Sequence, residues 1–324
     1  MKNLVFFLLL TYSFIANAQK FEYQVLFEGI GDNREYFSGK SMSQTILGSR
    51  GAFELGTSVD GHQIRAGLSH LYEFGSTIDF QQPKLILYYH YTDIKKDFYF
   101  GSFPRKGLID FPLAMLTDTL LYYRPNIEGM LGEVRWGWGK QTAFVDWTSR
   151  QTDTKRETFM AGSSGEIKYK NLFIENYLLL YHHAGAAIDV PGDHIKDYLG
   201  YAVQGGYRLN KQAGFTGYIK TGILASVYRE RSVTNGFILA KSMLSEIYMK
   251  YKNYAVKSVF HSGDGQRFYF GDPFYRVKSY MRTDVIWYFI NHKNIKGRFN
   301  LSFHLIEGDD LDQSQQLSIV YYVK

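Results

Sequence analysis

The sequence contains no cysteine, only 6 prolines among 324 residues, and no long apolar run beyond residue 15. The absence of cysteine excludes disulfide bridges and the lipidated cysteine of a lipoprotein. The absence of long apolar runs excludes transmembrane helices, which need about 20 consecutive apolar residues. The chain must therefore be held together by packing, by backbone pairing or by a membrane that surrounds it.

The N-terminal segment has the pattern of a secretory signal. Lys2 supplies a positive charge, residues 4–15 form a short apolar core, and Ala16-Asn17-Ala18 provides a small-x-small cleavage site. We predict a signal peptide over residues 1–18 and a mature domain over residues 19–324.

The composition is rich in aromatics without being hydrophobic on average. Aromatic residues make up 17% of the chain, glycine contributes 31 residues, and the mean hydropathy is −0.26. No long apolar repeat of helical period accompanies them. An outer-membrane β-barrel has this composition because its lipid-facing and lumen-facing residues alternate and cancel in any average. The alternative fold for such a composition is a secreted β-sandwich.

Apolar and polar residues alternate along many segments. Near the C-terminus, for example, Phe299, Leu301 and Phe303 alternate with Asn300 and Ser302. Such a period of two places one set on each face of a β-strand.

About sixteen such segments can be counted, with an error of about two. Two of them, 84–91 and 172–182, are nearly apolar on both faces, so their assignment depends on flanking turns and β-propensity. The predicted strands are 20–30, 46–59, 63–74, 84–91, 97–103, 127–136, 141–149, 156–169, 172–182, 198–209, 214–228, 237–251, 253–262, 277–290, 296–306 and 315–324.

The lengths of the connections alternate as well. Every even-numbered connection is short, as at 60–62 and 170–171, whereas the odd-numbered ones include 31–45, 104–126 and 263–276. Outer-membrane barrels have short periplasmic turns and longer outer loops. The pattern favours an all-β, transmembrane antiparallel barrel with both termini in the periplasm.

The whole mature chain resembles the general-porin class in its architecture. In that class a long loop after the fifth strand folds into the barrel and narrows the channel, and here the matching segment is 104–126. The resemblance implies a pore constriction formed by Arg105, Lys106, Asp110, Asp118 and Arg124. The chain departs from the class in ending on Lys324 instead of an aromatic residue. Gly192-Asp193-His194 and Gly271-Asp272-Pro273 resemble phrases of Bacteroidetes-type outer-membrane barrels, which imply no activity.

The polar faces of the strands predict which charges line the lumen. These lumen-facing residues are Arg65, Arg135, Asp146, Arg208, Lys220, Arg282, Asp284 and Arg298. Cations and anions on these faces nearly balance. Such charges can orient polar solutes in a pore, or they can simply keep the wall hydrated.

Two histidine-containing segments are candidates for catalysis or metal binding. His261-Ser262 faintly resembles the His-Ser region of outer-membrane phospholipases, in which a histidine activates a serine, but the spacing and the asparagine of that family are missing. His182, His183, Asp189, Asp193, His194 and Asp197 include borderline and hard metal ligands without a fixed spacing. We therefore expect no catalytic residues, no metal site, no cofactor and no enzyme activity.

The predicted function is an outer-membrane channel for passive diffusion of small hydrophilic solutes, constricted by residues 104–126. The alternatives are a dedicated transporter of specific or hydrophobic solutes, a barrel enzyme acting on lipids, and a surface adhesin. The expected partners are outer-membrane lipids, the barrel-insertion machinery and the solutes. A homo-oligomer is compatible with the pattern, and no nucleic acid is expected.

Overall fold

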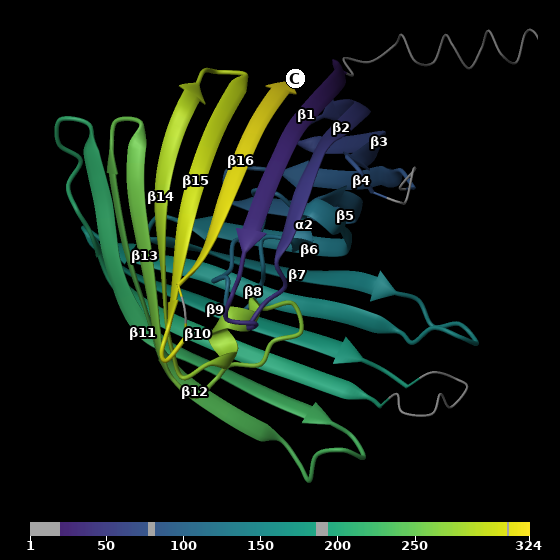
Figure 1. Ribbon diagram of the computed structural model, residues 1–324. Helices are drawn as coiled ribbons and strands as arrows, with labels where there is room; N and C mark the ends of the chain where they lie inside the picture. Colours follow the sequence, from purple (N-terminus) through teal and green to yellow (C-terminus); the bar gives the residue numbers. More distant parts are fainter. Residues whose placement is uncertain (1–19, 77–81, 186–193, 310) are drawn as a thin grey trace, which may run out of the picture.

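The computed structural model describes residues 20–76, 82–185, 194–309 and 311–324. They form one closed antiparallel barrel of sixteen strands in which β1 is hydrogen-bonded to β16 (Figure 1). The strands are β1 (Lys20–Glu35), β2 (Gln44–Val59), β3 (His62–Glu73), β4 (Lys84–Thr92), β5 (Lys96–Pro104), β6 (Asn126–Trp136), β7 (Gly139–Ser149), β8 (Thr158–Tyr169), β9 (Leu172–His183), β10 (Lys196–Arg208), β11 (Phe215–Glu230), β12 (Ile238–Tyr251), β13 (Tyr254–Gly263), β14 (Ser279–Asn291), β15 (Ile295–Ile306) and β16 (Asp312–Val323). The predicted fold class and strand count are confirmed.

The predicted strand boundaries are least accurate where the barrel closes. β1 continues to Glu35, five residues past the predicted end at Ile30, and β16 begins at Asp312 instead of Gln315. The extra residues are paired, since Glu35 lies opposite Gln313 in the register of the two strands. Polar residues and glycine obscured this pairing in the sequence.

Adjacent residues of each strand face opposite sides of the wall. On β16, Gln316 is 7% exposed and points inward, whereas its neighbour Leu317 is 42% exposed and points outward. Apolar side chains cover the outer face, as a membrane-spanning barrel requires. Closure also leaves no strand edge with unpaired backbone groups.

The connections at one end of the barrel are short and those at the other end are longer. In the β2–β3 turn, Asp60 and Gly61 have φ values of 49° and 82°, the left-handed values that a two-residue hairpin turn needs. The start of β1 and the end of β16 lie together at the short-turn end (Figure 1). We call the opposite end the long-loop end.

Two of the longer connections contain short helical turns. The first inward loop, residues 105–125, includes α2 (Leu120–Tyr123), and the second inward loop, residues 264–278, includes the 3-10 turn η1 (Pro273–Arg276). Within the described ranges, no helix is long and apolar enough to cross a membrane.

Candidate functional site

Arg105 holds the base of the first inward loop against the wall. Its backbone N–H donates to the Pro125 carbonyl at 2.7 Å, which closes the two ends of the loop on each other. Its buried guanidinium donates to the carbonyls of Arg124 at 3.1 Å and Asn126 at 2.9 Å. The same group forms an ion pair with Asp146 of β7. Arg105 therefore joins the ends of the loop to the barrel wall.

The centre of the first inward loop packs on an apolar part of the inner wall. Phe111, Met115 and Leu120 are buried, and the ring of Phe111 meets that of Phe144 edge-on with 6.0 Å between centroids. Burying a large apolar side chain stabilises a structure by about 1.5–3 kcal/mol, so the loop stays inside the barrel, as predicted. The wall residues buried with it on β4 to β9 include Ile86, Tyr88, Phe103, Ile127, Leu131, Phe144, Met160, Leu179 and Tyr181. The cluster continues on β10 to β15 through Ala202, Leu224, Leu244, Val259, Tyr280 and Ile306.

The second inward loop pairs with the first. The Thr117 N–H donates to the Phe270 carbonyl at 2.7 Å, and the Asp272 N–H donates to the Leu113 carbonyl at 2.9 Å. Phe274 is buried in the same apolar cluster. The sequence analysis treated this segment only as an outer loop. Its run of aromatic residues, unusual for a solvated loop, was the signal that could have identified it.

A strip of polar side chains on β1, β14, β15 and β16 faces the two loops. Arg34 forms an ion pair with Asp32 at 2.5 Å and approaches Asp118 of the first inward loop at 3.5 Å. The Gln316 amide donates to both carboxylates, at 3.1 Å to Asp32 and 2.9 Å to Asp118. Nearby on β14, Arg282 forms an ion pair with Asp284 at 2.7 Å.

Asp118 and Asp272, the loop carboxylates that face this strip, have opposite pKa shifts. Burial opposes ionisation of Asp118, but the charges of Arg282 and Arg34 and the Gln316 hydrogen bond more than offset it, so its pKa is held below the usual range. Burial dominates at Asp272 and raises its pKa to about 6, although Arg282 works in the other direction. At neutral pH both carboxylates are ionised, and only Asp272 gains its proton in mild acid.

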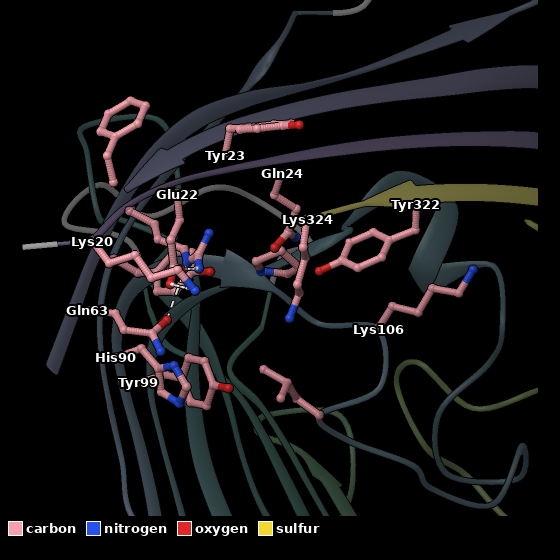
Figure 2. Close-up of a pocket in the computed structure, with 15 residues that line it drawn as sticks. Lys20, Glu22, Tyr23, Gln24, Gln63, His90, Tyr99, Lys106, Tyr322 and Lys324 are labelled. Carbon is pink, nitrogen blue, oxygen red and sulfur yellow. Dashed lines mark hydrogen bonds and ion pairs between the residues drawn. The ribbon is translucent and has the colours of Figure 1, made fainter. Parts of the chain in front are cut away.

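Three of the cavities that the described residues form lie along the lumen. One of about 440 Å³ lies towards the long-loop end, and one of about 300 Å³ lies deeper. These two share four lining residues, Thr117, Asp118, Arg282 and Gln316. A third cavity of about 640 Å³ lies at the short-turn end and is lined by Lys106 and Leu108 of the first inward loop (Figure 2). The four shared residues therefore mark the boundary between the first two cavities.

The five residues predicted for the constriction lie at different depths. Asp118 is at the junction of the two cavities, and Asp110 is exposed and lines the deeper one. Lys106 forms an ion pair with Glu28 and lines the cavity at the short-turn end. Arg105 is buried at the base of the loop.

Arg124 accepts a hydrogen bond from Arg105 through its carbonyl, but its side chain lines neither of the two cavities at the junction. Its side chain is exposed beside α2 and donates to the Thr148 carbonyl at 3.2 Å. Sequence reasoning also missed Arg34, because it ended the first strand at residue 30, and Gln316, because it gave no priority to uncharged side chains.

The predicted lumen-facing residues are mostly engaged in ion pairs along the wall. Arg282 and Asp284 pair with each other, and Asp146 pairs with Arg105. Arg298 lines the deeper cavity. The other pairs are Arg65 with Glu22, Arg135 with Asp97 and Glu133, Arg208 with Glu166, and Lys220 with Glu175.

Comparison with known families assigns the chain to a family. The model of the Lipid A 3'-O-deacylase-type family matches residues 16–323. The chain belongs to this family. Because the family is an enzyme family, the prediction that the protein is not an enzyme is wrong. No curated protein sequence matches the chain.

Solved structures similar to this deacylase-type chain are outer-membrane barrels. A loop-deletion mutant of OmpT, an outer membrane protein of Vibrio cholerae, has a TM-score of 0.58 at 10% identity, with 95% of this chain and 100% of that chain covered. Salmonella typhi OmpF, in complex with daunomycin, has a TM-score of 0.56 at 10% identity, covering 94% and 98%. Pseudomonas aeruginosa OpdK with vanillate has a TM-score of 0.51 at 8% identity, covering 94% and 98%. At these identities the likeness shows the fold alone.

The histidine that the sequence analysis considered for catalysis is enclosed. His261 of the deacylase-type chain is fully buried and packs edge-on against Tyr275, with 5.5 Å between ring centroids. Ser262 follows it on the same strand, so its side chain points to the opposite face of the wall. These two residues therefore cannot act as a nucleophile and base.

A different histidine of the chain does contact a serine. His304 Nε2 lies 3.4 Å from Ser314 Oγ, and the Tyr280 hydroxyl lies 2.7 Å from His304 Nδ1. Ser314 lines the cavity towards the long-loop end. The three residues come from β14, β15 and β16, so only cross-strand register brings them together, and no local motif could have revealed them.

The candidate metal ligands are only partly described. His182 pairs with Asp197 at 2.7 Å, while Asp189 and Asp193, and with them most of the Gly192-Asp193-His194 phrase, lie outside the described residues. Across the described part of the chain, no three acidic or histidine side chains are grouped so that they could hold a metal ion.

Proposed function

We propose that the protein is an outer-membrane channel through which small hydrophilic solutes diffuse past the two inward loops. The observation that carries this proposal is the pair of cavities that share Thr117, Asp118, Arg282 and Gln316. The inward loops occupy the apolar side of the lumen and leave the polar strip to line the path.

The charges at this junction supply the selectivity. Arg34 contacts the carboxylate of Asp118 and Arg282 lies near it, so a solute that passes this cluster meets positive and negative charges side by side. Charges in a narrow space with low-dielectric walls act on ions more strongly than the same charges at a surface. Solutes with both polar and charged groups should therefore pass more readily than apolar ones.

Conductance of the purified protein in a planar bilayer tests this function. Gln316→Trp places a large ring at the junction and should reduce single-channel conductance strongly. Gln315→Trp, on the adjacent outward-facing position, is the matched control and should leave conductance unchanged. A protein that folds but never conducts would contradict the channel.

We also propose a membrane orientation, with both chain ends in the periplasm. The polarity of outer-membrane barrels supports it, since their short turns are periplasmic. An epitope inserted at Gly39 or Asp309, in long-loop connections, should be accessible on intact cells, whereas one at Asp60-Gly61 should not. The opposite pattern would reverse the orientation. We also propose that the chain is cleaved before Gln19. The barrel-assembly machinery then inserts the mature chain, which assembles into homo-oligomers.

Hydrolysis of an acyl ester of lipid A is a second candidate function, favoured by the family match over residues 16–323. His304 would accept the Ser314 Oγ proton while Oγ attacks the ester carbonyl, and Tyr280 would hold the imidazole in place. The histidine would then protonate the departing sugar oxygen, and water would release the fatty acid from Ser314.

Mass spectrometry of lipid A from cells that express the protein tests this activity. Loss of one acyl chain that disappears with Ser314→Ala would establish it. Unchanged lipid A with well-folded protein would exclude it and leave the channel proposal unaffected.

A further inference from the structure

The cavity at the short-turn end has an excess of positive charge. Its lining includes Lys20, Arg65, Lys106 and Lys324, whereas Glu22 is its only acidic side chain among the described residues. Figure 2 shows Lys20, Lys106 and Lys324 on different sides of the cavity, with Lys324 and Lys106 on the side of Tyr322. The cations therefore surround one space instead of forming a patch on an outer surface.

Arg65 is only partly satisfied by the protein. Its side chain is 7% exposed, and it pairs through Nη2 with Glu22 and through Nε with Gln63 at 3.4 Å. Its Nη1 is buried and has no hydrogen-bond partner among the described residues. A ligand oxygen in the cavity would satisfy this buried donor, which costs stability while it is unpaired.

Two of the lysines are also available to a ligand. Lys20 lies 3.8 Å from Glu22, a long contact, and its side chain is 79% exposed. Lys324 lies over the ring of Tyr322, 5.6 Å from its centroid, and makes no ion pair with an acidic side chain within the described residues. A ligand anion would therefore meet two ammonium groups that no close ion pair among the described residues holds in place.

Flat rings form another part of the lining. His90 and Tyr99 stack with 3.9 Å between centroids and an interplanar angle of 11°. Tyr88 lies beside Tyr99 at 6.1 Å, and Tyr322 reaches the cavity from β16. Figure 2 places the stacked pair across the cavity from Tyr322 and Lys106. A flat ligand ring could pack against these rings while its acidic group faced the cations.

We propose that this cavity binds small organic anions that carry a carboxylate or phosphate group on a flat ring. Its volume of about 640 Å³ suits such a molecule. Arg65 would donate from Nη1 to the oxyanion, Lys324 would neutralise it, and Tyr99 would contact the ring. The site lies at the opposite end of the lumen from the Ser314 region, and binding there does not require that the protein conducts or hydrolyses anything.

Calorimetric titration of the full-length mature protein in detergent tests the site with four probes. Benzoate and phenyl phosphate should both bind, cyclohexanecarboxylate should bind more weakly, and benzamide should not bind. Comparison of the first two probes distinguishes a carboxylate from a phosphate preference. Equal binding of benzamide would refute the requirement for an anion, and equal binding of cyclohexanecarboxylate would refute the requirement for a flat ring.

Substitutions connect the binding to the named residues. Arg65→Gln should weaken benzoate binding on the order of tenfold, the loss expected for one charge-assisted hydrogen bond. Lys324→Gln and Tyr99→Leu should weaken it less, and Lys324→Gln carries little risk to folding because it lies at the strand end. Lys95→Gln, in an exposed turn at the same end, is the matched control. Unchanged binding in both Arg65→Gln and Lys324→Gln would overturn the proposal, whatever the bilayer recordings show.

Discussion

Two stretches of the inner wall of this barrel, called here the apolar half and the polar half, differ in the side chains that they bury. On β4 to β9 its buried side chains are largely apolar, as at Ile86, Phe144 and Leu179, and the first inward loop covers them. On β1 and β14 to β16 they are largely polar, as at Asp32 and Gln316, and they border the remaining space. A lumen-facing surface is therefore not polar by necessity: it is apolar where another part of the chain excludes water from it.

This difference explains the two segments whose sequence was apolar on both faces. In β9, Leu178 points to lipid and is 47% exposed, whereas Leu179 points inward and is 5% exposed. The inward residue belongs to the cluster that holds the loop. A strand that is apolar on both faces thus identifies the part of the wall that an inward loop covers.

Of the changes that test this difference between the two parts of the wall, deleting residues 107–121 should have the largest effect. Without the loop the apolar half would be uncovered and the lumen would widen, so single-channel conductance should increase several-fold. Removing residues 152–155, an exposed stretch of the β7–β8 connection, should not change it. An unchanged conductance after the first deletion would show that the loop does not limit the path.

Breaking the buried Arg105–Asp146 ion pair at the base of the first inward loop should have the next largest effect. Asp146→Ala leaves the Arg105 charge buried without its partner and should lower the free energy of unfolding by about 3–5 kcal/mol. Arg124→Ala, on the exposed side of the loop, should change it by no more than about 0.5 kcal/mol. Urea unfolding in detergent measures both. Similar losses in the two variants would mean that Arg105 does not anchor the loop.

The contrast between the outer and inner faces of the wall can be tested at neighbouring residues of β16, which lie at nearly the same depth in the membrane. Leu317→Arg places a charge in lipid and should cost about 2–4 kcal/mol of folding free energy. Ser318→Arg, one residue further and facing the lumen, should cost clearly less because water reaches it. Yield of heat-modifiable folded barrel reports the difference. If both variants fold equally well, β16 does not face lipid as described.

The smallest expected effect is a change of ion selectivity with pH at the polar half. Because burial raises the pKa of Asp272 to about 6, its carboxyl is neutral below that pH and ionised above it. Raising the pH from about 5 to about 7.5 adds a negative charge near Arg282 and Asp118, so cation preference should increase.

Reversal potentials across a salt gradient measure this change. The pH response should disappear in Asp272→Asn, while Asp309→Asn, in an exposed connection, should preserve it. A response that survives in Asp272→Asn would assign the titration to another group.

The sequence alone was sufficient for the barrel, because each strand carries its own alternation and each turn its own residues. Phe299, Leu301 and Phe303 indicate an outward face without reference to any distant part of the chain, and Asp60-Gly61 indicates a hairpin. The inward course of residues 104–126 was implied instead by the resemblance to the general-porin class. The same resemblance suggested Asp118 for the constriction, although not its partners.

Only the tertiary structure decided which side chains meet across the lumen. Arg105 pairs with Asp146, Gln316 joins Asp32 to Asp118, and the second inward loop pairs with the first. These contacts join residues far apart in the chain, and they depend on strand register and on the path of two loops, neither of which leaves a periodic signal. Alternation is a property of neighbouring residues, whereas a functional site in a closed barrel is a property of opposite walls.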